Sequence, residues 1–135
     1  MQKLIWLVLG VMSLHLVFAV CNYEEPKPEE EEFQIVKVTT YTTDPAQTDA
    51  TPFITASGFK LNKKNPKKHR IIAVSRDLRK KLKFGDKVRL EGTGKYDGIY
   101  YVHDLMNVRF RNRIDILINP TDKPTMFKKA KLIIL

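Results

Sequence analysis

Cysteine is almost absent from this sequence, and its scarcity excludes two classes of small protein. The single cysteine, Cys21, cannot form a disulfide within the chain, so a fold held together by disulfides is excluded. A zinc site built from several cysteines is excluded for the same reason. No glycine-rich loop of the kind that holds phosphate groups is present. With 135 residues, the chain has room for one modest core and not for two.

The charge is distributed unevenly along the chain. Residues 1–32 contain six glutamates and two lysines, a formal charge of −4, whereas residues 33–135 carry +13. Basic clusters at 60–70, 76–83 and 109–113 will attract polyanions. Nucleic acid is the first such partner to consider, but the export signal described next argues against it. Outside the cytoplasm the available anions are cell-wall glycopeptide, lipopolysaccharide and phospholipid headgroups.

Residues 1–21 have the layout of an export signal. Lys3 is followed by an apolar run over residues 4–20, after which the chain becomes polar. The tetrad Phe-Ala-Val-Cys at 18–21 resembles a bacterial lipobox, in which Cys21 would be lipidated and become the mature N-terminus. An ordinary signal-peptidase site after Ala19 and an uncleaved anchor helix are the alternatives. We therefore expect an exported protein of the cell envelope, attached to a membrane by a lipid or by this segment.

An acidic linker and a single domain follow the signal segment. Residues 22–32 read NYEEPKPEEEE, with two prolines, six glutamates and almost no apolar side chain. Such a segment cannot form a core and is expected to act as a tether. Residues 33–135 are rich in Ile, Leu, Val, Phe and Tyr and form the domain. Nothing in the sequence specifies an oligomeric state.

The domain reads as mainly β. Short runs of β-branched and aromatic residues, several of them alternating with polar ones, predict six strands. Turn residues separate the runs, and the connections are too short for repeated βαβ units. The natural solution is a small closed barrel, because closure removes exposed strand edges. The expected strands are Phe33–Tyr41, Ile71–Val74, Lys87–Glu91, 99–105, 113–118 and 131–135.

One or two short helices are expected beside the strands. Residues 76–83 place Leu78 and Leu82 four positions apart, with Ser75 as the N-cap. A second helix is predicted from Thr121 or Asp122 to Ala130, with a proline in its first turn.

Two aspartates are the candidates for chemistry. Asp115 stands in the middle of an apolar strand, where desolvation would raise its pKa and keep it protonated, as a general acid requires. Asp104 ends another strand, and if the two strands are neighbours the carboxylates would lie close together. The alternatives are that Asp115 faces solvent and pairs with an arginine, and that Asp104 is a turn residue.

Metal binding and nucleophilic catalysis find little support in the sequence. His103 adjoins Asp104, but adjacent strand residues point to opposite faces and no third ligand is indicated. Ser57 lies in Thr-Ala-Ser-Gly, which is not the nucleophile elbow of serine hydrolases. We expect no metal and no cofactor.

The ordered set of motifs in the domain resembles a known family, the 3D domain. This domain is a double-psi β-barrel named for three aspartates and found in cell-wall enzymes such as the membrane-bound lytic transglycosylases. The matching segments, in the family's order, are Val-Thr-Thr-Tyr at 38–41, Thr-Ala-Ser-Gly at 55–58, Ile-Ala-Val at 72–74, Leu-Lys-Phe-Gly-Asp-Lys-Val at 82–88, Val-His-Asp at 102–104 and Asn-Arg-Ile-Asp at 112–115.

The resemblance implies a function. Such family members cleave the β-1,4 bond between N-acetylmuramic acid and N-acetylglucosamine and leave a 1,6-anhydro ring. Asp115 would be the acid and base of this reaction, and Asp104 would orient or polarise it. Peptidoglycan glycan strands are the expected partner. The residues implied to bind substrate are Tyr41, Thr55, Ser57, Ser75, Asp77, Arg111 and Arg113.

The chain departs from the family pattern in several places, including three extra residues before Gly85 and a longer, more basic segment at 60–70. Ser75 stands where the family has its first aspartate, and Asp77 follows two residues later. Asp104 is followed by Leu-Met-Asn where the family has Thr-Gly-Gly. A non-catalytic, glycan-binding lipoprotein on the same barrel is therefore the alternative reading, because fold alone does not settle function.

Overall fold

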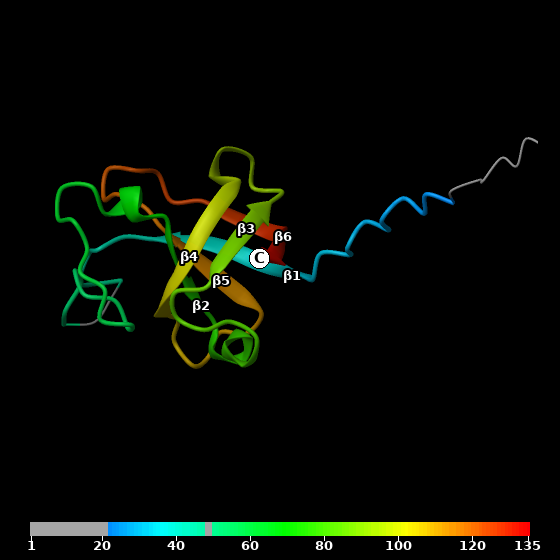
Figure 1. The fold of residues 1–135 in the computed structure, drawn as a ribbon. Coiled ribbons are helices and arrows are strands. Elements are labelled where there is room, and N and C mark those ends of the chain that lie inside the picture. The colour runs from blue at the N-terminus through cyan, green and yellow to red at the C-terminus, as the bar shows by residue number, and fades with distance from the viewer. Residues whose placement is uncertain (1–21, 48–49) are drawn as a thin grey trace, which may run out of the picture.

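Six strands pair edge to edge until the sheet closes on itself, in the computed structural model that describes residues 22–47 and 50–135 (Figure 1). The order around the barrel is β1-β5-β2-β4-β3-β6, and β6 pairs with β1 to complete the ring. The expected mainly β class and closed six-stranded barrel are confirmed. The strands are β1 (Phe33–Tyr41), β2 (Ile71–Val74), β3 (Lys87–Glu91), β4 (Gly98–Leu105), β5 (Arg113–Leu117) and β6 (Met126–Ile134).

The strand pairing mixes two directions. β1 runs parallel to β5, and β2 runs parallel to β4, whereas the other four pairs are antiparallel. Parallel neighbours need crossover connections rather than hairpins. Residues 42–70, which connect β1 to β2, leave the barrel as a long excursion (Figure 1). The arrangement is compatible with a double-psi barrel.

The main core fills the inside of the barrel. Its residues come from alternate positions, such as Ile72 and Val74 on β2 and Ile114 and Ile116 on β5, because strand side chains alternate between faces. A second, smaller cluster lies outside the barrel and includes Tyr41, Leu61, Ile71, Ala73, Met106 and Leu117. β2 is therefore buried along its whole length, since it has one cluster on each face.

The helix predicted over residues 121–130 is wrong. Those residues lead into β6, which pairs with both β1 and β3. Ala130 and Leu132 reach the core inside the barrel. A helix here would leave the edges of β1 and β3 unpaired, so the gain from closing the barrel outweighs the local helical signals.

The other predicted helix is shorter and tighter than expected. Residues Arg76–Lys80 form η2, a 3-10 helix that buries Leu78, and Leu82 is buried beyond its end. Ser75 holds the N-cap position but makes no side-chain capping bond. The helices of the described residues are this one and two further 3-10 helices, η1 (Pro66–His69) and η3 (Gly94–Tyr96).

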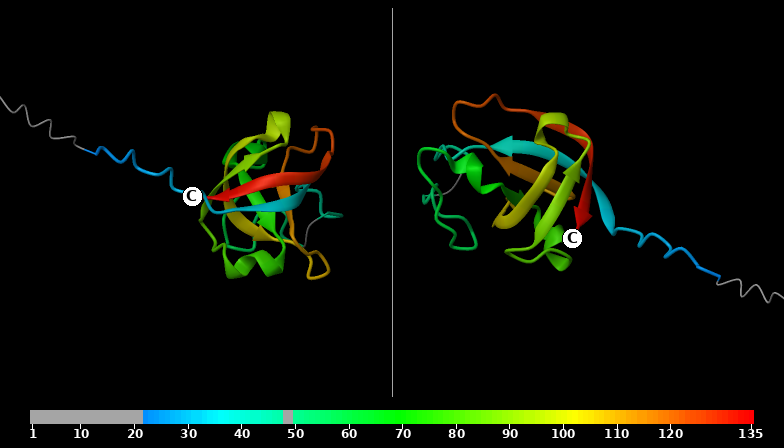
Figure 2. Two further views of the ribbon diagram at one scale, coloured as in Figure 1. Left: turned by 90° about the vertical axis from the view of Figure 1, so that its right-hand side faces the viewer. Right: turned by 45° about the horizontal axis from the view of Figure 1, so that its top comes forward.

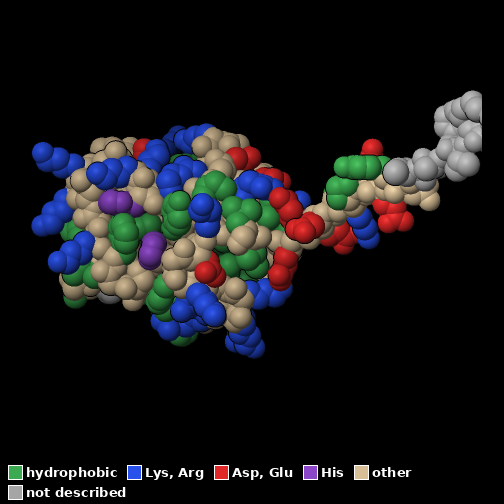
Figure 3. Space-filling view, in the orientation of Figure 1, with side chains coloured by type: hydrophobic (Ala, Val, Ile, Leu, Met, Phe, Trp, Pro, Cys, Tyr) green, Lys and Arg blue, Asp and Glu red, His purple; other side chains and the backbone are tan. Residues whose placement is uncertain are grey.

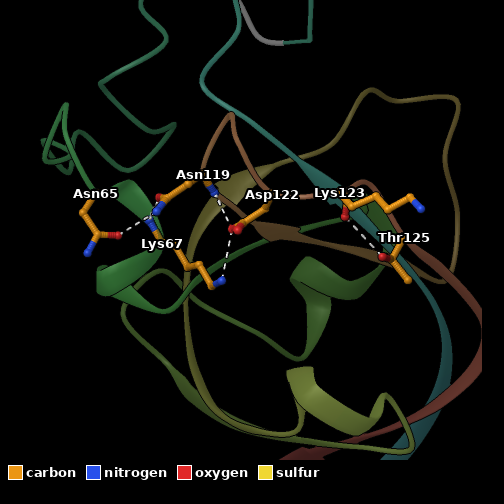
Figure 4. Close-up of polar contacts among 6 residues, drawn as sticks. All are labelled: Asn65, Lys67, Asn119, Asp122, Lys123 and Thr125. Carbon is orange, nitrogen blue, oxygen red and sulfur yellow. Dashed lines mark hydrogen bonds and ion pairs between the residues drawn. The ribbon is translucent and has the colours of Figure 1, made fainter.

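The basic end of the excursion is tied to the turn before β6 (Figure 4). The Asn119 side chain donates to Asn65 Oδ1 at 3.0 Å and accepts from the Lys67 backbone N–H at 3.0 Å. Lys67 also forms an ion pair with Asp122, at 3.1 Å. These contacts fix a lysine-rich loop against the body of the domain.

The acidic linker reaches the barrel at the end away from the excursion (Figures 1 and 2). Glu32 pairs with Lys81 at 2.9 Å, and Glu31 pairs with Arg89 at 2.6 Å. Figure 3 shows Lys and Arg side chains standing out from the excursion, whereas most acidic side chains on that face lie on or near the linker. In residues 22–47 and 50–135, no helix is long and apolar enough to cross a membrane. The predicted signal segment and Cys21 lie outside the described residues.

Candidate active site

Asp104 and Asp115 flank a single residue of β2. Ala73 is the register partner of Asp104 on one side and of Asp115 on the other. The strands that carry the two aspartates are therefore not neighbours, because β2 runs between them, so the condition considered from the sequence is not met. Two strand spacings place the two Cα atoms about 10 Å apart, on the same face of the sheet. The small Ala73 side chain leaves the space between the carboxyl groups open.

A β-bulge aims Asp104 toward this face. The β2–β4 register runs from Ile72–Val102 to Ala73–Asp104, so β4 contains one extra residue, His103. A bulge of this kind re-aims a side chain, and it is a common feature next to active sites. His103 and Asp104 consequently both lie outside the barrel, although regular strand geometry predicts opposite faces. No local feature of the sequence predicts this bulge.

Three donors orient the Asp104 carboxylate. The Tyr41 hydroxyl donates to Oδ2 at 3.0 Å, and the backbone N–H groups of Ala56 and Leu105 donate to Oδ1 at 3.1 and 3.0 Å. Burial, reinforced by the nearby Asp104 charge and this hydrogen bond, raises the pKa of Tyr41 well above its usual value. Tyr41 therefore stays protonated and remains a donor. Tyr41 as a whole is only 8% exposed.

Asp115 is partly buried and has a different set of partners. Burial raises its pKa, and the Asp104 charge adds to the effect. A hydrogen bond from the Thr39 hydroxyl and the charge of Arg113 act in the opposite direction without cancelling it. Thr39 is the register partner of Asp115 on β1, and the sequence reading did not single it out. A carboxyl group with a raised pKa is suited to donate a proton.

The two carboxyl groups share one cavity of about 500 Å³. The cavity lies outside the barrel, between β2 and the segments that follow β1 and β4. Its size is typical of a site for a small molecule, and its surface is mostly polar. Its described lining residues are Tyr41, Ala46, Gln47, Thr51, Pro52, Ile54, Ala73, Arg76, Asp104, Leu105, Met106, Asn107, Arg109, Phe110 and Asp115.

Thr55 and Ser57 support the cavity without lining it. Thr55 accepts from the Phe59 backbone N–H at 3.2 Å, and its hydroxyl lies 3.0 Å from that of Ser57. Ser57 Oγ lies 2.9 Å from His103 Nδ1, and the Ser57 N–H donates to the His103 carbonyl. Burial lowers the pKa of His103, which favours the neutral ring. This network holds the turn whose Ala56 N–H binds Asp104.

Ser75 and Asp77 lie apart from the cavity and bind backbone groups. Ser75 is fully buried, and its hydroxyl accepts from the Arg113 N–H at 3.0 Å. Asp77 accepts from the Asn112 N–H at 2.9 Å. Burial acts to raise the pKa of Asp77, but hydrogen bonding with Ser75 and Asn112 outweighs it, and the pKa is lowered. Through these hydrogen bonds both residues hold the start of β5 in place, where Asn112 adopts a φ of 49°.

The arginines of the cavity differ from those that the motifs suggested. Arg111 and Arg113 do not line it, and Arg113 instead packs over the Phe110 ring at 4.5 Å. Arg76 and Arg109 do line it, and both are exposed. Arg109 also lies over Phe110, at 4.7 Å. The basic clusters of the sequence contain all of these arginines, but the paths of the loops determine which of them line the cavity.

The described part of the chain contains no group of three or more His, Cys, Asp or Glu side chains placed to hold a metal ion. The side chains of the cavity offer proton transfer, through Asp115, and hydrogen bonding. The sequence matches no protein-family model, and no curated protein matches it.

Proposed function

We propose that this protein is an exported lytic transglycosylase of peptidoglycan. It cleaves the β-1,4 bond between N-acetylmuramic acid and N-acetylglucosamine and leaves a 1,6-anhydro product. One observation carries the proposal: two carboxyl groups flank Ala73 in a single open cavity, and one of them has a raised pKa. The resemblance of the motifs to the 3D domain supports the same reading, since the closed barrel is compatible with the double-psi barrel of that family.

Asp115 acts first as the acid and then as the base. Its proton moves to the glycosidic oxygen as the bond to C1 of the muramic sugar breaks, and the N-acetylglucosamine end leaves as an alcohol. The resulting Asp115 carboxylate then takes the proton of the C6 hydroxyl while that oxygen bonds to C1. Asp115 is protonated again at the end, so one residue serves both steps and no water is consumed.

Asp104 supports Asp115 from the other side of Ala73. Its negative charge favours the protonated form of Asp115 before the reaction. The same charge stabilises the positive charge that develops at C1 during cleavage. Tyr41 and the N–H groups of Ala56 and Leu105 hold the Asp104 carboxylate in place.

Arg76 and Arg109 give the cavity a second recognition element. Both line it, and guanidinium groups bind carboxylates through paired hydrogen bonds. The lactyl and peptide carboxyl groups of peptidoglycan supply such partners.

The second candidate is a non-catalytic, glycan-binding lipoprotein on the same barrel. The observation that favours it is the role of Ser75, the serine that stands at the position of the family's first aspartate. Its hydroxyl is buried and occupied by the Arg113 N–H, so it contributes no carboxylate to the cavity. The cavity would then hold a glycan without cleaving it.

A digest of purified peptidoglycan by the purified protein separates the candidates. Mass spectrometry of the products is compared with a digest by an Asp115→Asn variant. Products that end in 1,6-anhydro-muramic acid, formed only by the unaltered protein, support the transglycosylase. Reducing ends would mean a hydrolase and contradict the mechanism. No products, with the protein still sedimenting with the wall material, would favour the binding protein.

A further inference from the structure

A second groove adjoins the cavity that contains Asp104 and Asp115. It has a volume of about 330 Å³ and is mostly apolar. Three residues, Thr51, Pro52 and Ile54, line both spaces, so the two share a wall. A ligand long enough to pass this wall would occupy both. The other lining residues of the groove are Phe53, Lys60, Leu61 and Lys63.

The groove is built on a small hairpin. The Thr55 N–H donates to the Phe59 carbonyl at 2.9 Å, and the Leu61 N–H donates to the Phe53 carbonyl at 2.8 Å. An isolated bridge pairs Ile54 with Lys60. The tip of this hairpin supplies the Ala56 N–H that binds Asp104. One local unit therefore forms the groove and holds a carboxylate of the cavity.

The two lysines of the groove have defined positions, Lys60 in the hairpin opposite Ile54 and Lys63 in the turn that follows it. Asn62 Oδ1 accepts from the backbone N–H groups of Lys64 and Asn65, each at 2.9 Å, and its own N–H donates to His69 Nε2. Lys63 lies over the Phe53 ring at 5.5 Å. An ordered turn loses less conformational freedom when a ligand binds than a flexible one does.

The charge of the groove has one sign. Lys60 and Lys63 line it and are exposed, and no acidic side chain is among its described lining residues. The apolar floor formed by Phe53, Ile54 and Leu61 is suited to aliphatic side chains rather than to sugar hydroxyl groups. The combination favours a ligand that is both acidic and partly aliphatic.

We propose that this groove binds a short acidic peptide that is attached to the glycan in the cavity. The protein would then recognise a glycopeptide and not a bare sugar chain. Lys60 and Lys63 pair with the peptide carboxylates, and Phe53 and Leu61 contact its aliphatic side chains. The assignment rests on the proposed function, because it takes the sugar to lie between Asp104 and Asp115.

A binding measurement tests the groove without relying on catalysis. The probe is the stem peptide released from purified peptidoglycan by an amidase, labelled with a fluorophore and titrated with the purified protein. The variant carries Lys60→Gln and Lys63→Gln. The control carries Lys128→Gln and Lys129→Gln, which remove the same charge from exposed positions on β6. Since all four lysines are exposed, both variants are expected to fold, which a thermal melt verifies.

The groove variant is expected to bind the peptide about fivefold or more weakly than the control variant, since two ion pairs are lost. Equal binding by the two variants would overturn the assignment. A second measurement compares digestion of intact glycan strands with strands whose peptides an amidase has removed. Faster digestion of the intact strands supports the groove, and equal rates contradict it while leaving the transglycosylase in place. Lysine-dependent peptide binding without any digestion would reject the transglycosylase and keep the peptide site.

Discussion

The sequence motifs assign two pairs of polar residues to one site, but the two pairs have different roles in the structure. Asp104 and Asp115 face a shared cavity on either side of Ala73. Ser75 and Asp77 bind the backbone N–H groups at the start of β5. Polar side chains that satisfy buried backbone groups hold the chain in place, whereas side chains that face an open cavity are free to meet a ligand. Loss of Ser75 or Asp77 should therefore affect stability, and loss of Asp104 or Asp115 should affect activity.

The largest expected effect is on activity. Asp115→Asn removes the proton donor while keeping the shape of the side chain, so turnover of peptidoglycan should fall about 10²- to 10⁴-fold. The rate of anhydro-product formation measures it. Asp86→Asn, which lies outside the cavity lining, is the control and should keep its activity. Undiminished turnover by the Asp115 variant would remove Asp115 from the reaction.

The next effect is on stability. Ser75→Ala removes the acceptor of the Arg113 N–H, and the Ser75 side chain itself is fully buried, so the free energy of unfolding should fall by about 1–3 kcal/mol. A thermal melt should show a Tm lower by roughly 4 °C or more. Ser57→Ala is the matched control and should lose less, because Ser57 is only half-buried. A drop in Tm no larger than that of the control would show that the Ser75 hydroxyl does not stabilise the start of β5.

Removing one donor from Asp104 should have a smaller effect on activity. Tyr41→Phe keeps the ring in its cluster and deletes the hydrogen bond to Asp104 Oδ2. One charge-assisted hydrogen bond is worth about 1.5 kcal/mol at the lower end, so kcat should fall roughly tenfold. Tyr101→Phe, at an exposed position of β4, should leave kcat unchanged. Equal rates for the two variants would remove Tyr41 from the site.

The raised pKa of the partly buried Asp115 carboxyl group should make the stability of the protein depend on pH. Asp115 has a pKa above 3.8 in the folded protein, so the folded state holds a proton that the unfolded state has released. Stability contributed by this group is present below pH 3.8 and is lost as pH rises through the folded pKa. Asp115→Asn should therefore raise Tm at neutral pH and leave it unchanged near pH 3. The same Tm difference at every pH would contradict the raised pKa.

The smallest expected effect is a shift in the pH profile of activity. Thr39 donates to Asp115 and lowers its pKa, so Thr39→Val should raise that pKa further. The alkaline limb of the rate profile reports the loss of the Asp115 proton and should move to higher pH. Thr40→Val, one residue along β1, is the control. An unshifted limb would show that Thr39 does not act on the acid.

Much of the barrel was predictable because its signals are local. β1, β2 and β3 have the predicted bounds, and β4 and β5 differ by a single residue. Their side chains alternate or form short apolar runs, and neighbouring residues suffice to reveal either pattern. The region before β6 was misread because Pro124 and the preceding polar residues resemble a helix start. The competing force, pairing with β1 and β3, comes from segments far away in the sequence.

The sequence by itself determined the six strands, the barrel class and the two aspartates as candidates, because alternation and an acid within an apolar strand are visible locally. Only the tertiary structure decided that β2 separates the strands of Asp104 and Asp115, that a bulge turns Asp104 outward, and that Arg76 and Arg109 line the cavity. These features depend on parallel pairing and on loop paths between distant segments. Such contacts are determined by the closure of the whole sheet, and no periodic pattern of residues in the sequence predicts them.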